Sequence, residues 1–367
     1  MTHDMSPVRG VSRRDFLKYC GGVAALIGIR GVTGMDVARA LEHMLETRPS
    51  VVWTSFQACT GCAVSLLQTR RPSVSDLILR QISLDYQENI MAAAGDAAEH
   101  LYEELLQGEF YWVAEGSVAT DPPEAMLIAG RPSTELAREA YDRAAATIAI
   151  GSCATYGNVQ ASNPNPTGAM GIADFLRSDG VADPVVINLS RCPGNGDDLV
   201  MTLSYVLVTG ELPELDSIGR PVFLYGQMIH DNCFRRGHFD AGRFVEDFGD
   251  EGWEQDWCLY KVGCKGPFTF APCGNTMWNG GVSWCVRNGT CIGCAEPRFW
   301  DQQTPFYEQS PGVTLPGVGG VSAESIGIGL GALTAVGLGA HAVAQAATGR
   351  FGKGGPPEGE GETGGDR

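Results

Sequence analysis

The chain of 367 residues is long enough for two domains with a sizeable buried core. Its 26 basic and 43 acidic residues give a net charge of -17, which argues against nucleic acid as a partner because phosphate binding requires a basic surface. Twelve cysteines are more than a chain of this length usually has, but their share of the sequence is far below that of a small disulfide-rich protein. What the thiols bind is therefore the main question that the sequence raises.

The first 40 residues have the form of an export signal. Arg13 and Arg14 in "SRRDFLKYCGG" precede a short, Gly/Ala-rich apolar run, and Ala38 and Ala40 offer an A-x-A cleavage site. This pattern predicts a twin-arginine signal peptide over residues 1–40, with an ordinary basic terminus or a Sec signal as the alternatives. Twin-arginine export carries folded proteins, which suits a chain whose cofactor is inserted before it crosses the membrane.

Strand-like runs alternate with helical patterns between residues 41 and 215. In chain order they are "SVVWTSF", "AGDAAEHLYEELLQ", "EFYWVAEGS", "STELAREAYDRAAA", "TIAIGSC", "GIADFLRS", "PVVINLS" and "DLVMTLSYVLV". This alternation predicts an α/β fold with a right-handed parallel sheet, whose sites lie at the carboxyl ends of the strands. Cys59, Cys153 and Cys192 each follow a predicted strand and Glu115 ends a fourth, so we expect them at one edge of the sheet.

Regular periodicity fades after residue 215. Residues 216–315 are loop-like, aromatic and rich in cysteine. A segment without a sheet or long helices of its own needs another source of order. Bound metal supplies it, because the free energy of binding becomes free energy of folding.

An uncharged stretch near the C-terminus is long enough to cross a bilayer. Residues 325–348 would span about 36 Å as a helix. Because Arg350 and Lys353 follow, the positive-inside rule places the C-terminus in the cytoplasm. We expect a membrane helix over residues 322–348, with a flexible Gly/Ala-rich tail as the alternative, and a disordered tail over residues 349–367.

Eleven cysteines remain once Cys20 leaves with the signal, and with one histidine they fall into three groups of four. The first group is Cys59, Cys62, Cys153 and Cys192; the second is His230, Cys233, Cys258 and Cys264; the third is Cys273, Cys285, Cys291 and Cys294. Such groups fit iron-sulfur clusters, zinc ions or, after export, disulfides. Iron-sulfur is the preferred interpretation because three clusters in series conduct electrons, and the flanking glycines allow backbone N–H groups to approach cluster sulfurs.

The motifs together resemble those of a known family. "SRRDFLK", "CTGCAVSLL", "GSCATYGNVQAS", "RCPGNG", "IHDNCFRRGHFDAGRFV", "CLYKVGCKGP", "WNGGVSWC" and "CIGCAEPRFWD" follow the order found in small subunits of periplasmic, membrane-bound nickel-iron hydrogenases of the uptake type. They cover nearly the whole chain. The resemblance implies a flavodoxin-like domain over residues 41–215 with one cluster, and a domain over residues 216–315 with two more.

The resemblance also implies the cofactors and partners. It implies a proximal 4Fe-4S cluster on the first group, a distal 4Fe-4S cluster with one histidine ligand on the second, and a medial cluster on the third. The nickel-iron centre would lie in a separate large subunit, so this chain would transfer electrons and contain no catalytic residue. The chain would lie on the periplasmic side of the cytoplasmic membrane, the expected acceptor is a membrane cytochrome b, and a dimer of heterodimers is a further expected assembly. An iron-sulfur subunit of another membrane-linked oxidoreductase is the alternative.

Two departures from the family pattern carry information. Cys285 stands where most members have a proline, and those members hold a medial 3Fe-4S cluster through the other three cysteines of the group. A fourth thiolate predicts a medial 4Fe-4S cluster, or a 3Fe-4S cluster if Cys285 is a buried free thiol. Gly61 and Asn158 occupy the positions of two extra cysteines in oxygen-tolerant members, so an ordinary proximal cubane is expected.

Overall fold

The computed structural model describes residues 48–69, 82–282, 284–309, 313–315, 319–321 and 323–348. The chain divides into two compact units, Met1–Ser310 and Pro311–Arg367. The predicted signal peptide over residues 1–40 and the predicted disordered tail over residues 349–367 lie outside the described residues.

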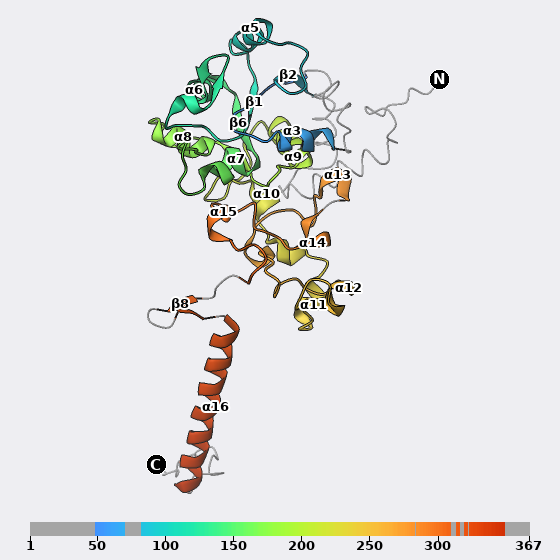
Figure 1. The fold of residues 1–367 in the computed structure, drawn as a ribbon, viewed down its shortest axis with the longest axis vertical. Coiled ribbons are helices and arrows are strands. Elements are labelled where there is room, and N and C mark those ends of the chain that lie inside the picture. The colour runs from blue at the N-terminus through green and yellow to red at the C-terminus, as the bar shows by residue number, and fades with distance from the viewer. Residues whose placement is uncertain are drawn as a thin grey trace, which may run out of the picture. The chain divides into compact units, whose positions relative to one another are not determined.

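A parallel sheet of five strands forms the centre of the first unit (Figure 1). The strand order is β2-β1-β3-β6-β7, and every neighbouring pair runs parallel, which confirms the predicted α/β fold class. The alternation of patterns did not reveal β2, an edge strand of sequence Ser-Leu-Asp-Tyr-Gln whose first three residues are half-exposed and which lacks the apolar run of a buried strand. The bounds are β1 (Ser50–Ser55), β2 (Ser83–Gln87), β3 (Tyr111–Glu115), β6 (Ala146–Ile150) and β7 (Ile187–Leu189).

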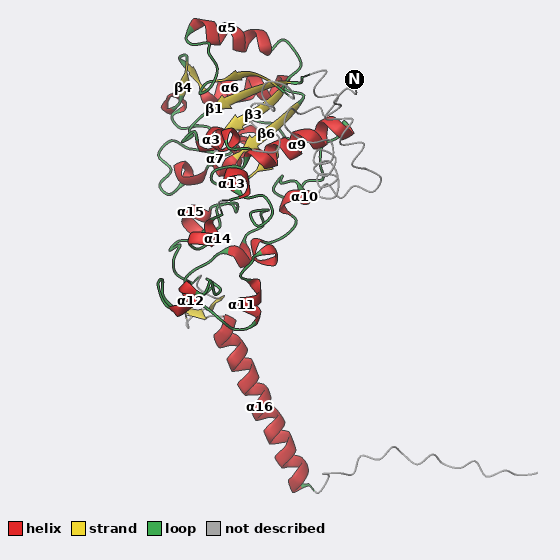
Figure 2. Ribbon diagram, turned by 90° about the vertical axis from the view of Figure 1, so that its right-hand side faces the viewer, coloured by secondary structure: helices red, strands yellow, loops and turns green. Residues whose placement is uncertain are grey.

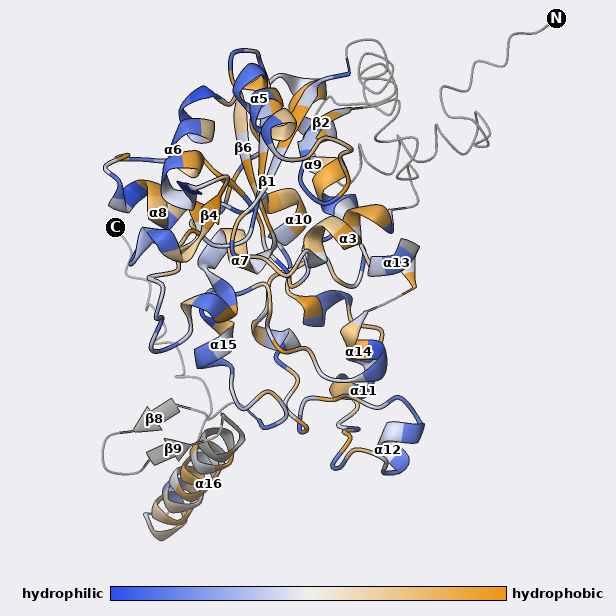
Figure 3. Cartoon of the chain, turned by 45° about the horizontal axis from the view of Figure 1, so that its top comes forward, coloured by the Kyte–Doolittle hydropathy of each residue, from blue (hydrophilic) through white to orange (hydrophobic). Residues whose placement is uncertain are grey.

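Helices cover both faces of this sheet, as Figure 1 shows. Three pack on one face around Val52 and Trp112, namely α5 (Asp96–Leu105), α6 (Ser133–Arg143) and α8 (Ile172–Ser178). Two pack on the other face around Trp53 and Ile148, namely α3 (Gly61–Leu67) and α9 (Gly196–Thr209). Because successive strand residues point to opposite faces, adjacent Val52 and Trp53 belong to different cores. In Figure 3 the strands are largely hydrophobic, whereas α5 and α6 present hydrophilic surfaces to the outside.

Shorter elements complete the sheet region, and one of them carries a predicted ligand. Helix α7 (Gly151–Tyr156) begins directly after β6 and contains Cys153. The others are η2 (Pro123–Ala125), β4 (Leu127–Ile128), β5 (Arg131–Pro132) and η3 (Asn158–Ala161).

The described residues from 216 to 309 form loops and short helices, as Figure 2 shows. The longest of these helices has five residues. Trp284, Val286 and Cys273 of this segment join the core on the α3 and α9 face of the sheet. The elements are α10 (Val222–Tyr225), η4 (Ile229–Asn232), α11 (Arg236–Asp240), α12 (Glu251–Glu254), η5 (Gly266–Phe268), α13 (Trp278–Gly281), α14 (Cys285–Asn288) and α15 (Phe299–Gln302).

The second unit contains an antiparallel strand pair and one long helix. The strands are β8 (Val313–Leu315) and β9 (Gly319–Val321), and the helix is α16 (Ala323–Ala347). Within α16, Ile328–Ala347 is long and apolar enough to cross a membrane, by length and composition. Its leucine and valine side chains are exposed, which suits contact with lipid or with another helix.

Candidate metal centres

The carboxyl ends of adjacent strands bring the first group together. Cys59 follows β1, Cys153 lies on α7 directly after β6, and Cys192 follows β7. Cys62 lies in the first turn of α3. Because β1, β3, β6 and β7 are consecutive in the sheet, their ends form one edge, where binding sites of parallel α/β folds lie.

Hydrogen bonds and electrostatic contacts connect these thiols. Asn158 Nδ2 donates to Cys153 Sγ at 3.1 Å and to Cys192 Sγ at 3.4 Å, and the Gly194 N–H donates to Cys62 Sγ at 3.3 Å. Burial raises the pKa of all three thiols, that of Cys153 to about 11, and neighbouring thiols raise each pKa further. A bound cation would favour the ionised forms of these sulfurs.

A buried carboxylate orients the first turn of α3. Glu115, at the end of β3, is 1% exposed and accepts hydrogen bonds from Trp53 Nε1 and from the Cys62 N–H, both at 3.1 Å. Glu88 follows β2 and accepts from the Ser55 N–H at 3.1 Å. Burial raises the pKa of both carboxyls, that of Glu88 to about 7. Glu115 therefore holds the Cys62 backbone against the end of β3, at the edge where the sequence predicted it.

Gly151 leaves room for the sulfur of Cys62. Its φ is +82°, and a Cβ built there would lie 2.4 Å from Cys62 Sγ. We expect Gly151→Ala to destabilise the chain by about 2 kcal/mol or more, since it adds a steric clash to backbone strain. It should also lower the metal content. Both are measurable by denaturant unfolding and metal analysis.

Gly130 provides the matched control for this variant. Its φ is +83°, and a Cβ there would meet nothing within 4 Å. Gly130→Ala should therefore show only the strain, about 1 kcal/mol, with normal metal content. Equal losses in the two variants would contradict a specific role for Gly151.

All four members of the second group line one small cavity. They are His230, Cys233, Cys258 and Cys264. Burial lowers the pKa of His230, and nearby Arg236 lowers it further, which favours the neutral imidazole that a metal ligand requires. The ring packs edge-on against Phe239, with ring centroids 4.5 Å apart.

Backbone N–H groups approach the sulfurs of the second and third groups in a repeated pattern. In four cases the donor is the residue two positions after the cysteine. Such hydrogen bonds favour the charged form of a thiolate and tune the potential of a cluster. The pairs of cysteine and donor are Cys233 and Arg235, Cys258 and Tyr260, Cys264 and Gly266, and Cys291 and Gly293.

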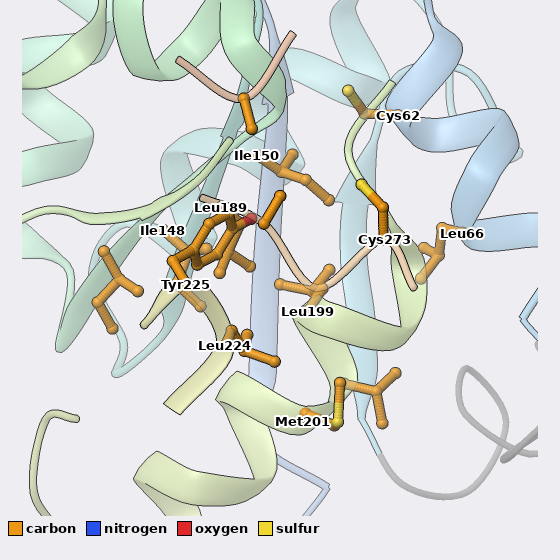
Figure 4. Packing of buried hydrophobic residues seen from close by; sticks show 14 of the residues in the cluster. Cys62, Leu66, Ile148, Ile150, Leu189, Leu199, Met201, Leu224, Tyr225 and Cys273 are labelled. Atoms are coloured by element: carbon orange, nitrogen blue, oxygen red, sulfur yellow. The ribbon is translucent and has the colours of Figure 1, made fainter. Parts of the chain in front are cut away.

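The third group lies beside the first. One cavity is lined by Cys273, Cys285, Cys291 and Cys294 together with Cys192 of the first group. Cys285 begins α14, and its proximity raises the pKa of the Cys291 thiol. Figure 4 shows Cys62 and Cys273 within one packed core. The structure thus brings Cys285 to the other three thiols, and its role as a ligand stays a prediction.

Shared cavity walls connect consecutive groups. Cys192 of the first group lines the cavity of the third, and Ile229, next to His230 of the second group, lines the cavities of both the second and the third groups. The Lys265 N–H also donates to the Cys291 carbonyl oxygen at 2.8 Å. The three groups therefore form a row in the order first, third, second.

The donor sets suit iron-sulfur clusters, which cysteine thiolates and, in some centres, histidine hold. The eleven cysteines from Cys59 to Cys294 are all free thiols. Among the described residues, no three histidine, cysteine, aspartate or glutamate side chains converge on one position for a metal ion. Sequence reasoning missed Asn158 as a hydrogen-bond donor to two of the sulfurs. Asn158 is buried, has a φ of +55° and lies two residues after the helix that carries Cys153. Its role as a donor became recognisable only once the fold brought Cys153 and Cys192 beside it.

Two family models match successive parts of the chain. The model for the 20 Kd subunit of NADH ubiquinone oxidoreductase matches residues 59–206. The model for the C-terminal part of the NiFe/NiFeSe hydrogenase small subunit matches residues 225–307, which contain the second and third groups. This second match separates the chain from oxidoreductase subunits that share only its first part.

Relatives of similar length extend over most of the chain. The quinone-reactive Ni/Fe-hydrogenase small chain of Wolinella succinogenes is 42% identical over 347 residues, covering 91% of this chain and 96% of the relative. The periplasmic NiFe hydrogenase small subunit 1 of Nitratidesulfovibrio vulgaris is 45% identical over 304 residues, covering 82% and 94%. A solved NiFeSe hydrogenase structure from Desulfomicrobium baculatum matches with a TM-score of 0.67 and 33% identity, covering 72% of this chain and 99% of that one.

Proposed function

Since the chain belongs to the family of nickel-iron hydrogenase small subunits, we propose that its three groups of donors hold three iron-sulfur clusters. The chain is the electron-transfer partner of a hydrogenase large subunit. We assign a proximal 4Fe-4S cluster to the first group, a medial 4Fe-4S cluster to the third, and a distal 4Fe-4S cluster with His230 as one ligand to the second. These clusters would supply one-electron transfer between the large subunit and an acceptor.

The row of groups is the observation that carries this proposal. Cys192 of the first group lines the cavity of the third group, and the Lys265 N–H, next to Cys264 of the second group, donates to the Cys291 carbonyl oxygen of the third at 2.8 Å. Cys62, Cys273 and Cys291 of this row belong to one buried apolar core. Backbone N–H groups hold the sulfurs in place, so little rearrangement accompanies a change of charge.

The same proposal includes the organisation of the chain and its location. It comprises a twin-arginine signal over residues 1–40, a flavodoxin-like domain over residues 41–215, a cluster domain over residues 216–315 and an anchor over residues 322–348. The body would lie on the periplasmic side of the membrane. One relative is quinone-reactive and another is periplasmic, which favours a membrane cytochrome b as acceptor and export of the complex. A dimer of heterodimers is the assembly we propose.

The assignment is tested by metal analysis and EPR spectroscopy of the purified heterodimer. Three cubanes predict about 12 irons in this chain and, after reduction with hydrogen, iron-sulfur signals that come from reduced 4Fe-4S clusters alone. Zinc in place of iron would overturn the cluster assignment. Iron for only two clusters would overturn the three-cluster row.

Removal of the apolar helix should release the complex from the membrane. Deleting residues 323–367 removes α16, which is long and apolar enough to span a bilayer, so we expect most hydrogenase activity in the soluble periplasmic fraction. Deleting only residues 349–367 is the control and should leave activity in the membrane fraction. Membrane-bound activity after the longer deletion would show that a partner, rather than this helix, anchors the complex.

A further inference from the structure

Arg191 is a cation inside the protein at the junction of the first and third groups. It precedes Cys192 in the sequence, yet its Nη1 lies 3.9 Å from Cys273 Sγ. Its side chain is 0% exposed. A buried guanidinium is unfavourable unless other groups compensate its charge and satisfy its donors.

Three residues hold this guanidinium in one orientation. Nη2 forms an ion pair with Asp198, which is also 0% exposed, and donates to Thr276 Oγ1 at 2.6 Å. Nη1 donates to the Thr276 carbonyl oxygen at 2.8 Å, and the guanidinium lies 4.7 Å from the ring centroid of Trp278. The position of the charge relative to Cys273 is therefore determined by the fold.

One donor of Arg191 is left over. Nε is buried and has no hydrogen-bond acceptor among the described residues. A buried N–H donor without an acceptor destabilises the folded protein. Such a donor therefore indicates that a bound group supplies the acceptor. Cys273, which Nη1 approaches, lines the cavity of the third group.

A second buried arginine shows what is particular about Arg191. Arg220 is 5% exposed and forms ion pairs with Asp216 and Glu296 at 2.8 and 3.1 Å. Its other hydrogen bonds go to the carbonyl oxygens of Phe270 and Ala295. Arg220 thus connects loops through oxygen acceptors, whereas Arg191 also reaches a cysteine sulfur.

We propose that Arg191 is a positioning residue for the medial cluster, and that the Arg191–Asp198 pair sets the reduction potential of that cluster. The inference rests on the function proposed above, because it requires a cluster on the third group. Four thiolates bring more negative charge than three, and the fixed guanidinium stabilises the additional charge of the reduced form. Asp198 cancels part of this effect. Removing the cation should therefore lower the potential, and removing the anion should raise it.

Redox titration of the heterodimer, monitored by EPR, tests this. Arg191→Gln should shift the reduction equilibrium of the medial cluster at least tenfold toward the oxidised form. For one electron, this lowers the reduction potential by about 59 mV or more. Asp198→Asn should raise it by a similar amount, and the double variant should fall between the two. Arg191→Gln leaves Asp198 buried without its cation, which can prevent assembly of the complex. In that case the double variant, which has neither charge, is compared with Asp198→Asn to measure the effect of the guanidinium.

Arg220→Gln is the matched control, and we expect it to leave the medial potential unchanged. An unchanged potential in the Asp198 and double variants, with a normal medial signal, would overturn the inference. So would an equal shift in Arg220→Gln, since the effect would then come from total charge. A wild-type complex without a third cluster would instead contradict the proposed function.

Discussion

Preparing the chain without iron should unfold residues 216–309 while leaving the parallel sheet folded. The helices of this segment have at most five residues, and helices so short are not stable by themselves. Without metal the free energy of cluster binding is no longer available for folding. The sheet has its own support, because helices pack on both faces.

Hydrogen exchange measured by mass spectrometry resolves the two regions. With iron absent, amides of α10 to α15 should exchange about 100-fold faster or more, whereas those of β1, β3 and β6 should keep their protection. The strands serve as the internal control within the same sample. Equal protection of residues 216–309 with and without iron would mean that packing alone orders this segment.

Replacing Cys285 with serine should convert the medial cluster to the 3Fe-4S type. Cys285 and Cys291 both line the cavity of the third group, and the proximity of Cys285 raises the pKa of the Cys291 thiol. Losing this ligand should remove about one iron per chain and produce the EPR signal of an oxidised 3Fe-4S cluster. The medial potential should rise, because one thiolate charge is lost.

Asn288 offers a control on the same short helix, since it is exposed and lines the same cavity. Asn288→Ala should retain the iron content and the spectrum of the wild type. If Cys285→Ser also retains both, Cys285 is a free thiol and the third group has three ligands. That result would leave the other two clusters unaffected.

Local patterns made much of the fold and of the candidate site predictable. The apolar runs that became β1, β3, β6 and β7 are buried, and burial gives a strand its apolar signature. Once these strands were recognised, the edge rule for parallel sheets placed Cys59, Cys153 and Cys192 together. Strand β2 escaped prediction because its half-exposed residues do not carry that signature.

By itself, the sequence predicted the three groups of donors and the α/β fold, because the C-x-x-C and H-x-x-C spacings are local and buried strands alternate with helices. Only the tertiary structure decided what surrounds the sulfurs. A charged residue beside Cys192 would be expected at the surface, yet Arg191 is buried because Asp198 on α9 and Thr276, 85 residues away, supply its partners. Such partners are assembled by packing between distant segments, and no local pattern encodes that packing.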